Sequence, residues 1–286
     1  MARALRSVAE RLAELATVRG EPLHALQRLH ALEGVLRRVS QLPDRKSLVL
    51  RGSLMTRLWA QPARRTAEDV DFVTTFAFDR NRAEELLRTA LALPGGDDGV
   101  CFSVDLLHSA ATWMETPFPG IRMTVPARVA EVCHEVQIDL GFDDPLVPAA
   151  EWLEYPALRP EWNTTVRACR PELGCAWKIQ GLFEQRNWRK KDLYDISLIL
   201  RHRPLDLGVL REAVRVAFES RCTPLGTVRR LWQGDFGGSQ GSLRSWRRFR
   251  RDQGDPAIPE DHREVVRFVA DRLRPMLTAL LEEHGS

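Results

Sequence analysis

The sequence predicts an α+β protein in which a mixed sheet with helices is followed by a mostly helical region. Short apolar or alternating segments lie between residues 42 and 150 and are typical of strands. Apolar residues at three- and four-residue spacing dominate residues 1–41 and most of 151–286, which indicates helices. We therefore expect N-terminal helices over 1–41, a sheet-bearing core over 42–150 and a helical C-terminal domain over 151–286.

The composition excludes several classes of protein. Of the 286 residues, 44% are hydrophobic and 28% are charged. This composition provides enough apolar residues for a core and differs from that of a disordered chain. No run of eighteen apolar residues occurs and the N-terminal segment is charged, so we expect a cytoplasmic protein that binds no membrane and carries no secretory signal. The five cysteines contain no C-x-x-C pair, which argues against a disulfide scaffold or a cysteine zinc site.

The first half of the chain alternates between helical and strand patterns. Leucines recur at helical spacing up to Leu36, and Pro43 ends that pattern. An apolar strand at 47–50 follows and runs directly into a helical stretch that Pro62 ends. A second strand at 68–73 alternates charged and apolar residues, as expected for a half-buried strand.

The remaining elements are a helix over 79–93, a three-stranded meander over about 100–141 and several later helices. Pro126 in the middle strand of the meander indicates an edge or a bulge, because proline cannot donate to a sheet. Glycine-rich residues 234–241 are expected to form a flexible insert. The later helices are expected at 172–186, 192–202, 207–219 and 260–282.

Gly52-Ser53 and the pair Asp69 and Asp71 form the first candidate site. A Gly-Ser turn between a strand and a helix presents backbone N–H groups at a positive helix end, which suits a phosphate. Two aspartates at i and i+2 on a strand point the same way and together can hold a divalent metal. A polar strand face is the alternative, and the preceding Gly-Ser turn favours function.

Asp139 is a carboxylate within a strand whose neighbours alternate with apolar residues. If it lies beside the aspartate pair, it completes a three-carboxylate site for Mg²⁺. The alternative is a solvated aspartate on an exposed strand face. Asp105 has the same local pattern, but we rank it lower because no motif follows it.

Lys178, Asp192 and Asp195 lie in a third candidate region. Three of the four lysines of this arginine-rich chain fall between residues 178 and 191. Lys178 suits contact with a triphosphate as a compact charge, whereas the alternative is a surface lysine with its stem on the helix. For Asp192 and Asp195 the alternative is a capping box at a helix N-terminus.

Two stretches combine basic and aromatic residues, over 186–191 and over 244–251. Guanidinium groups contact phosphates and aromatic rings stack on unpaired bases, so both stretches favour RNA. The alternative for either is a solvated helix face with a buried tryptophan.

Taken together, the motifs around these residues resemble the AbiEii/AbiGii toxin family of nucleotidyltransferases, which includes the MenT toxins. The resemblance spans about residues 47–202. It implies a polymerase-β-like nucleotidyltransferase sheet followed by a helical domain. It also implies transfer of a nucleotide from an NTP with Mg²⁺, or Mn²⁺ as the alternative ion, and tRNA as acceptor. A cognate winged-helix antitoxin is the implied partner, and we expect the protein to be a monomer.

The resemblance also suggests individual roles. It implies that Gly52 and Ser53 bind phosphate, that Asp69, Asp71 and Asp139 bind metal, and that Lys178 is the family lysine. Asp192 and Asp195 match the aspartates of its R-D-x-x-D motif, with Lys191 in place of the usual arginine. Arg65 matches the arginine of Arg-x-Ser-x-Asp-Leu-Asp, from which the serine is missing here, and is expected to contact the nucleotide.

Two other functions use the same residues. The acceptor could be a small molecule or a protein side chain, since the catalytic groups serve all three. A catalytically inactive relative that only binds RNA or a partner protein is the other alternative. The presence of the Gly-Ser turn, three carboxylates and the lysine argues against an inactive protein.

Overall fold

The computed structural model describes residues 2–61, 65–116, 118–184, 188–234 and 236–284. The chain forms two compact units, a sheet unit and a helical unit, and each is described by itself. The sheet unit comprises Met1–Leu54, Thr66–Asp144 and Ala150–Ala168, and the helical unit comprises Met55–Arg65, Pro145–Ala149 and Cys169–Ser286. The predicted α+β class with a mixed sheet is confirmed, while the predicted three-segment division stays a prediction.

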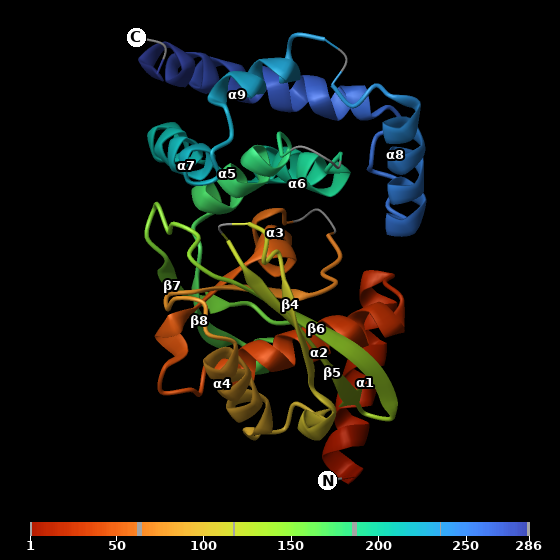
Figure 1. Cartoon of the computed structure of the whole chain (residues 1–286). Coiled ribbons are helices and arrows are strands. Elements are labelled where there is room, and N and C mark those ends of the chain that lie inside the picture. Colours follow the sequence, from red (N-terminus) through yellow and green to blue (C-terminus); the bar gives the residue numbers. More distant parts are fainter. Residues whose placement is uncertain (1, 62–64, 117, 185–187, 235, 285–286) are drawn as a thin grey trace. The chain divides into compact units, whose positions relative to one another are not determined.

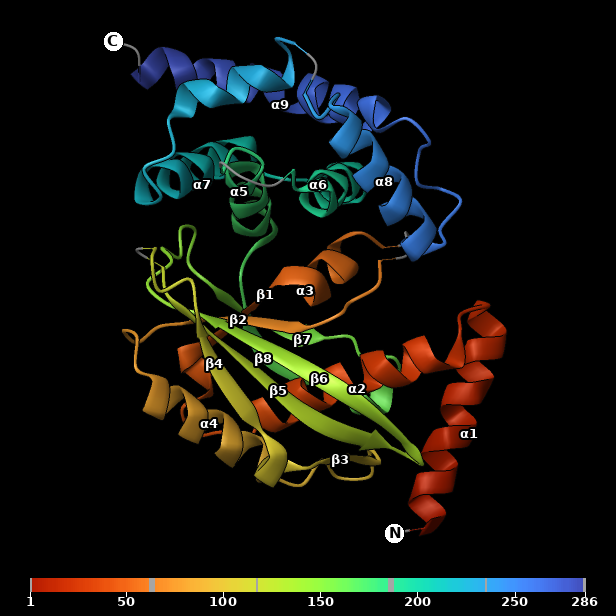
Figure 2. The same cartoon turned by 45° about the vertical axis from the view of Figure 1, so that its right-hand side comes forward.

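The sheet unit is built on one mixed sheet with strand order β3-β5-β6-β2-β1-β8-β7, and β4 pairs with β5 (Figure 2). The pairs β2–β6 and β1–β8 are parallel, whereas the other neighbours are antiparallel. The strands are β1 Leu48–Arg51, β2 Val70–Thr74, β3 Val100–Phe102, β4 His108–Thr112, β5 Gly120–Val129, β6 Val132–Gly141, β7 Glu151–Tyr155 and β8 Thr164–Ala168.

Helix α2 (Leu23–Val39) provides most of the helical cover of this sheet. It contacts β5, β6 and β8, and α4 (Arg80–Ala92) lies beside it (Figure 1). The leucines that predict α2, among them Leu32 and Leu36, are buried, because their spacing places them on one face of the helix. Helix α1 (Ala2–Arg19) packs on α2, and the 3-10 helices of this unit are η1 Arg45–Ser47, η2 Val104–Leu106 and η3 Pro160–Trp162.

Two details of the predicted meander differ in the structure. Pro126 was expected at an edge or a bulge; β5 as a whole is not an edge strand, since it pairs with β6 on one side and with β3 and β4 on the other, and its register with β6 is continuous through Pro126. Pro126 lies between the residues that pair with β4 and those that pair with β3, and its carbonyl accepts a hydrogen bond from Ser103. Because β5 changes its outer neighbour there, the missing N–H is tolerated. Asp105 lies in η2, where it is exposed, rather than on a strand.

Strands β7 and β8 were not predicted, because residues 151–168 were assigned to the helical region. They are short, and charged residues such as Glu151 and Glu154 obscure any apolar alternation. β8 depends on a partner distant in sequence, since its Ala168 pairs with Leu50 of β1, and β7 joins the sheet only through β8. Such pairing is not encoded in a local pattern.

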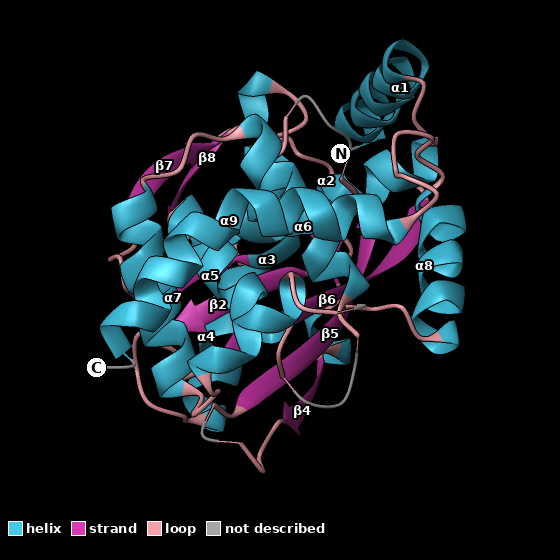
Figure 3. Cartoon of the chain, turned by 90° about the horizontal axis from the view of Figure 1, so that it is seen from above, coloured by secondary structure: helices cyan, strands magenta, loops and turns pink. Residues whose placement is uncertain are grey.

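The helical unit is organised around α5 (Pro171–Gly181), which contacts α6 (Lys190–His202) and α7 (Leu207–Ser220). The long α9 (His262–His284) packs on α6 and α7, as the view from above shows (Figure 3). The four predicted helices are present as α5, α6, α7 and α9, and η4 (Leu225–Leu231) precedes the glycine-rich segment.

Helix α8 (Gln240–Gln253) was not predicted as a helix, and it begins inside the segment expected to be a flexible insert. Residue 235 of that segment, like Pro62, lies outside the described residues. Ser239 caps the helix, because its hydroxyl accepts a hydrogen bond from the backbone N–H of Ser242. Trp246 and Phe249 are buried on its inner face. Across the described residues, we find no helix long and apolar enough to cross a membrane.

Candidate active site

The carboxylates of Asp69, Asp71 and Asp139 meet on one face of the sheet. Asp71 on β2 is in register with Asp139 on the parallel strand β6, and Asp69 lies immediately before β2. One oxygen from each carboxylate lies within 4.8 Å of the others. The i, i+2 spacing and the strand pairing therefore bring together the three aspartates that the sequence singled out.

The Gly52-Ser53 turn touches this cluster. Gly52 has φ +73°, and a Cβ at this position would lie 1.8 Å from Oδ2 of Asp71, so only glycine fits. The Ser53 hydroxyl donates to Oδ1 of Asp69 at 3.1 Å. Helix α3 (Gly52–Trp59) begins at this turn, as expected, so its first backbone N–H groups lie next to the carboxylates.

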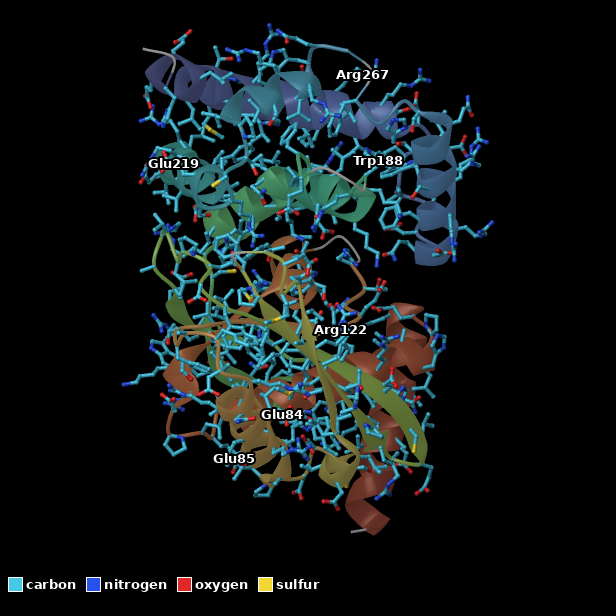
Figure 4. The ribbon with its side chains drawn as sticks, in the orientation of Figure 1. Glu84, Glu85, Arg122, Trp188, Glu219 and Arg267 are labelled. Carbon is cyan, nitrogen blue, oxygen red and sulfur yellow. The ribbon has the colours of Figure 1, made fainter. Side chains whose placement is uncertain are left out.

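Arg122 was not predicted from the sequence, although it lies on the same face. Its Nε and Nη2 donate to the two oxygens of Asp139 at 2.9 and 2.8 Å, and Gln137 donates to Oδ2 of the same carboxylate. These bonds to Asp139 raise the pKa of the Arg122 guanidinium. Arg122 is directly opposite Asp139 in the β5–β6 register (labelled in Figure 4). Only knowledge of that register could have identified it.

The donor set fits a divalent metal. Carboxylate oxygens are the preferred ligands of Mg²⁺ and Mn²⁺, and three of them from two strands converge here. Placing three like charges within 4.8 Å is costly; Arg122 offsets part of that repulsion at Asp139, and a divalent cation would relieve more of it. The close approach of Gly52 to Asp71 leaves backbone, rather than a side chain, beside the carboxylates.

A second cluster lies in the helical unit and joins Lys178, Asp192, Asp195 and Arg65. The Lys178 Nζ donates to Asp195 at 2.9 Å and to Asp192 at 3.3 Å. The Arg65 guanidinium donates to both oxygens of Asp195, with Nε at 2.7 Å from Oδ1. Asp195 is 1% exposed and is thus shared by two cations in the interior.

The electrostatics of this second cluster keep all its members charged. Burial alone would raise the pKa of the Asp195 carboxyl, but Lys178 and Arg65 outweigh burial and lower it. Burial would likewise lower the pKa of the Lys178 ammonium, yet Asp195 and Asp192 raise it well above its ordinary value. Within this unit the lysine head group is therefore held between two aspartates.

This geometry corrects two alternatives weighed for these residues. Lys178 does not extend to the surface, because its side chain is only 14% exposed and its ammonium is ion-paired. Asp192 is not a helix cap, since α6 begins at Lys190 and the preceding Arg189 provides no side-chain cap. Asp195 points to Lys178 and Arg65 rather than to its own helix end.

The two basic–aromatic stretches meet in the structure. The ring centroids of Trp188 and of Trp246 on α8 are 6.1 Å apart, and Tyr194 of α6 packs on Phe249 (Figure 4 labels Trp188). Arg186, at the start of the first stretch, lies outside the described residues. Trp246 and Phe249 are 1% and 2% exposed, so these rings form a core and are not available for stacking on bases.

The basic side chains around that core lie on the surface of the helical unit. Their spacing on α8 follows i, i+3, i+4 and i+7, which places them on one helix face. Burial, then the charges of Lys191 and Arg248, lower the pKa of Lys190, although Asp252 opposes the shift, so Lys190 of α6 lies near Arg248 of α8. We call the following residues the basic surface: Lys190, Lys191, Arg244, Arg247, Arg248 and Arg251.

Comparisons with known proteins agree with this architecture. A family model described as "Nucleotidyl transferase AbiEii toxin, Type IV TA system" matches residues 34–273. The crystal structure of JHP933 from Helicobacter pylori is similar at 14% identity and a TM-score of 0.51, over 92% of this chain and 95% of that one. A second Helicobacter pylori structure, named for a nucleotidyltransferase, gives 14% identity and a TM-score of 0.50 over 91% of this chain and 97% of that one.

At this identity the two structures are evidence for a shared fold alone. No curated protein matches the sequence.

Proposed function

The chain belongs to the AbiEii family of nucleotidyltransferases, the toxins of type IV toxin–antitoxin systems, and we propose that it transfers nucleotides from an NTP to RNA. The proposed acceptor is the 3′ end of tRNA, as the resemblance to the MenT toxins implies. In this reaction the acceptor hydroxyl loses its proton, its oxygen forms a bond to the α-phosphorus, and the bond from that phosphorus to the leaving pyrophosphate breaks in line. Modification of that end would block translation.

The observation that carries the proposal is the convergence of Asp69, Asp71 and Asp139 at the Gly52-Ser53 turn. These carboxylates would hold Mg²⁺, which when bound neutralises triphosphate charge and makes the attacking hydroxyl more acidic. Gly52 allows phosphate oxygens to approach the backbone, and the Ser53 hydroxyl orients Asp69. Arg122 and Gln137 fix the plane of the Asp139 carboxylate.

Lys178 and Arg65 are proposed to contact the nucleotide. Asp195 holds both head groups, and Asp192 holds Lys178, so neither cation has to be ordered when a phosphate binds. We therefore propose that Asp192 and Asp195 support catalysis by positioning the head groups of Lys178 and Arg65.

The basic surface is proposed to hold the RNA. Six cationic side chains on α6 and α8 concentrate positive charge, and phosphates are the matching ligand. Because Trp246 and Phe249 are buried, we expect this surface to contact the RNA backbone rather than to stack on bases.

Labelling of RNA tests the proposed reaction. The full chain is incubated with Mg²⁺, total RNA and each α-³²P-labelled NTP in turn, beside the Asp71→Asn variant. We expect a label on tRNA-sized RNA with the wild type and none with the variant. Label on protein or on small molecules instead would support the alternative acceptors, and no label with any acceptor would support an inactive relative.

Salt titration tests the basic surface. A triple variant, Arg244→Gln with Arg247→Gln and Arg248→Gln, should weaken tRNA binding and reduce the slope of log K against log salt by about two to three. The matched control changes Arg211, Arg215 and Arg263, three arginines of the same unit that lie outside the basic surface. If both variants alter the slope equally, the basic surface has no special role.

The family implies a cognate antitoxin. We propose that this partner is a small winged-helix protein of the AbiEi kind, that the toxin itself is a cytoplasmic monomer, and that it binds no membrane. A neighbouring reading frame for such a protein, relief of toxicity on its co-expression and a monomeric mass in solution are the expected results. Toxicity that the neighbouring protein does not relieve would contradict the partner.

A further inference from the structure

An exposed tryptophan lies on the same face of the sheet as the three carboxylates. Trp113 follows β4 and is 43% exposed, and the adjacent Met114 is 55% exposed. Gly120 begins β5, and a Cβ at this position would lie 2.5 Å from Cε3 of the Trp113 indole. The indole is therefore seated directly on the backbone of Gly120.

The register of β5 places this indole relative to the carboxylates. Gly120 and Arg122 are two residues apart, so a side chain at 120 would project from the same face as Arg122. Arg122 binds Asp139, which belongs to the carboxylate cluster. Two residues along a strand span roughly 7 Å. The indole thus lies on the carboxylate face. Its separation from the Arg122–Asp139 pair is comparable to the length of one nucleoside.

A second glycine, next to Gly120 on the neighbouring strand, also leaves this face of the sheet without a side chain. Gly141 of β6 is in register with Gly120, and a Cβ there would lie 2.7 Å from Nη2 of Arg51. Glycine inside a strand costs stability because it loses more backbone entropy and packs no side chain. Two glycines in register here admit a flat indole and a guanidinium beside the carboxylates.

The conformation of Trp113 is held in place. Its φ is +54°, in the left-handed region that a bulky residue rarely adopts. Its carbonyl accepts hydrogen bonds from the backbone N–H and the hydroxyl of Thr116. These bonds hold the backbone of the turn that carries the indole, and a ring that rests on backbone on one side and is exposed on the other has the properties of a stacking surface.

We infer that the Trp113 indole is a stacking platform for a nucleobase at the site of Asp69, Asp71 and Asp139. This inference rests on the proposed function, because it assumes that phosphates bind at the carboxylates. The base belongs either to the NTP or to the end of the RNA acceptor. Stacking on an aromatic ring is tolerant of base identity, since every base has a flat π face.

Binding measurements on the full chain test the platform. Isothermal titration with Mg²⁺ and α,β-methylene NTPs, which resist cleavage, reports nucleotide binding. Inorganic tripolyphosphate reports the phosphates alone, and single-stranded RNA oligonucleotides report the acceptor. The variants are Trp113→Ala and Trp113→Phe. The control is Trp152→Ala, which removes a tryptophan of the same unit that is 47% exposed on β7.

We expect Trp113→Ala to weaken binding of the NTP analogue or of the oligonucleotide by about tenfold or more. The arm that changes identifies the source of the base. Trp113→Phe should be intermediate, because a smaller ring still stacks, and Trp152→Ala should bind as the wild type does. Tripolyphosphate binding should be the same in all four proteins.

Gly120→Ala provides a second test, because the added Cβ displaces the indole without removing it. It should reproduce the effect of Trp113→Ala. If Trp113→Ala binds both nucleobase probes as tightly as the wild type, the platform is overturned while the proposed function stands. If the wild type binds neither nucleotide nor tripolyphosphate, the proposed function fails and this inference fails with it.

Discussion

Two clusters of aspartates in this protein look alike in sequence but differ in charge balance. In the sheet unit, Asp69, Asp71 and Asp139 bring three carboxylates within 4.8 Å, and the Arg122 guanidinium is ion-paired with Asp139. In the helical unit, Asp192 and Asp195 are matched by the cations of Lys178 and Arg65. A D-x-D or D-x-x-D pattern does not distinguish these cases, whereas the balance of charge does.

The difference indicates what each cluster is built for. Carboxylates crowded together carry repulsion that a bound cation relieves, so the first cluster is suited to a ligand. A buried set of matched charges is complete by itself and is costly to break. The second cluster therefore holds its cations in fixed positions and depends on every member.

The largest expected effect is a loss of transfer activity when the first cluster is changed. Asp71→Asn should lower nucleotide transfer at least about a thousandfold, because it removes a metal-binding charge. Its stability without metal should be unchanged or slightly higher, since repulsion is reduced. Transfer is measured with labelled NTP, and stability by thermal melts with and without Mg²⁺. Near wild-type transfer, or an undiminished stabilisation by Mg²⁺, would contradict the metal assignment.

The corresponding aspartate-to-asparagine change in the second cluster should lower the free energy of unfolding. Asp195→Asn leaves Lys178 and Arg65 buried without their shared charge, so unfolding should cost about 3–5 kcal/mol less. Urea denaturation measures this. The control is Asp44→Asn, whose exposed pair with Arg82 should contribute less than about 1 kcal/mol. Equal losses in the two variants would mean that burial does not set the strength of the Asp195 pairs.

A buried histidine of the sheet unit should make the stability of the folded protein depend on pH. His30 is fully buried, and burial, followed by the charge of Arg37, lowers its pKa to about 4, although Asp98 opposes the shift. Between pH 6.5 and about 4 the unfolded chain therefore binds a proton that the folded chain does not. Stability should fall as the pH falls through that window, by roughly 3 kcal/mol for a shift of about 2.5 units.

Denaturation at a series of pH values measures the effect of His30. His30→Gln should flatten the pH dependence in this window, because glutamine does not titrate. An unchanged slope in the variant would show that other groups carry the loss of stability.

The smallest expected effect concerns Arg122. Arg122→Gln removes a positive charge from the carboxylate cluster, and Mn²⁺ should bind about three- to tenfold more tightly. Binding is measured by electron paramagnetic resonance of Mn²⁺. The control is Arg128→Gln on the same strand, in register with Cys133, and it should bind Mn²⁺ as the wild type does. Weaker binding in Arg122→Gln would mean that Arg122 orients Asp139 more than it competes with metal.

Local patterns were sufficient for much of the fold and for part of the candidate site. The helices α2, α6, α7 and α9 follow from apolar spacing, because the period of 3.6 residues is set by each helix alone. The Gly52-Ser53 turn follows in the same way. The family and the nucleotidyltransferase class, first suggested by the motifs, are confirmed by the family match. The individual site residues stay a prediction until their variants are measured.

Other features required the tertiary structure. Strand β8 pairs with β1 and in turn supports β7, and Arg122 is opposite Asp139 only in the observed register. Trp246 and Phe249 of the second basic stretch are buried, so these two rings are core and do not stack on bases. Each of these features joins residues far apart in the chain, and a local pattern contains no information about such neighbours.

The sequence by itself determined which residue types can perform the chemistry and where helices and strands begin. The tertiary structure decided which charges face one another. Asp71 and Asp195 each belong to a closely spaced pair of aspartates, but Asp71 lies among carboxylates and Asp195 lies between a lysine and an arginine. The physical reason is that the energy of a charge depends on its burial and its neighbours, and both are set by contacts between distant segments.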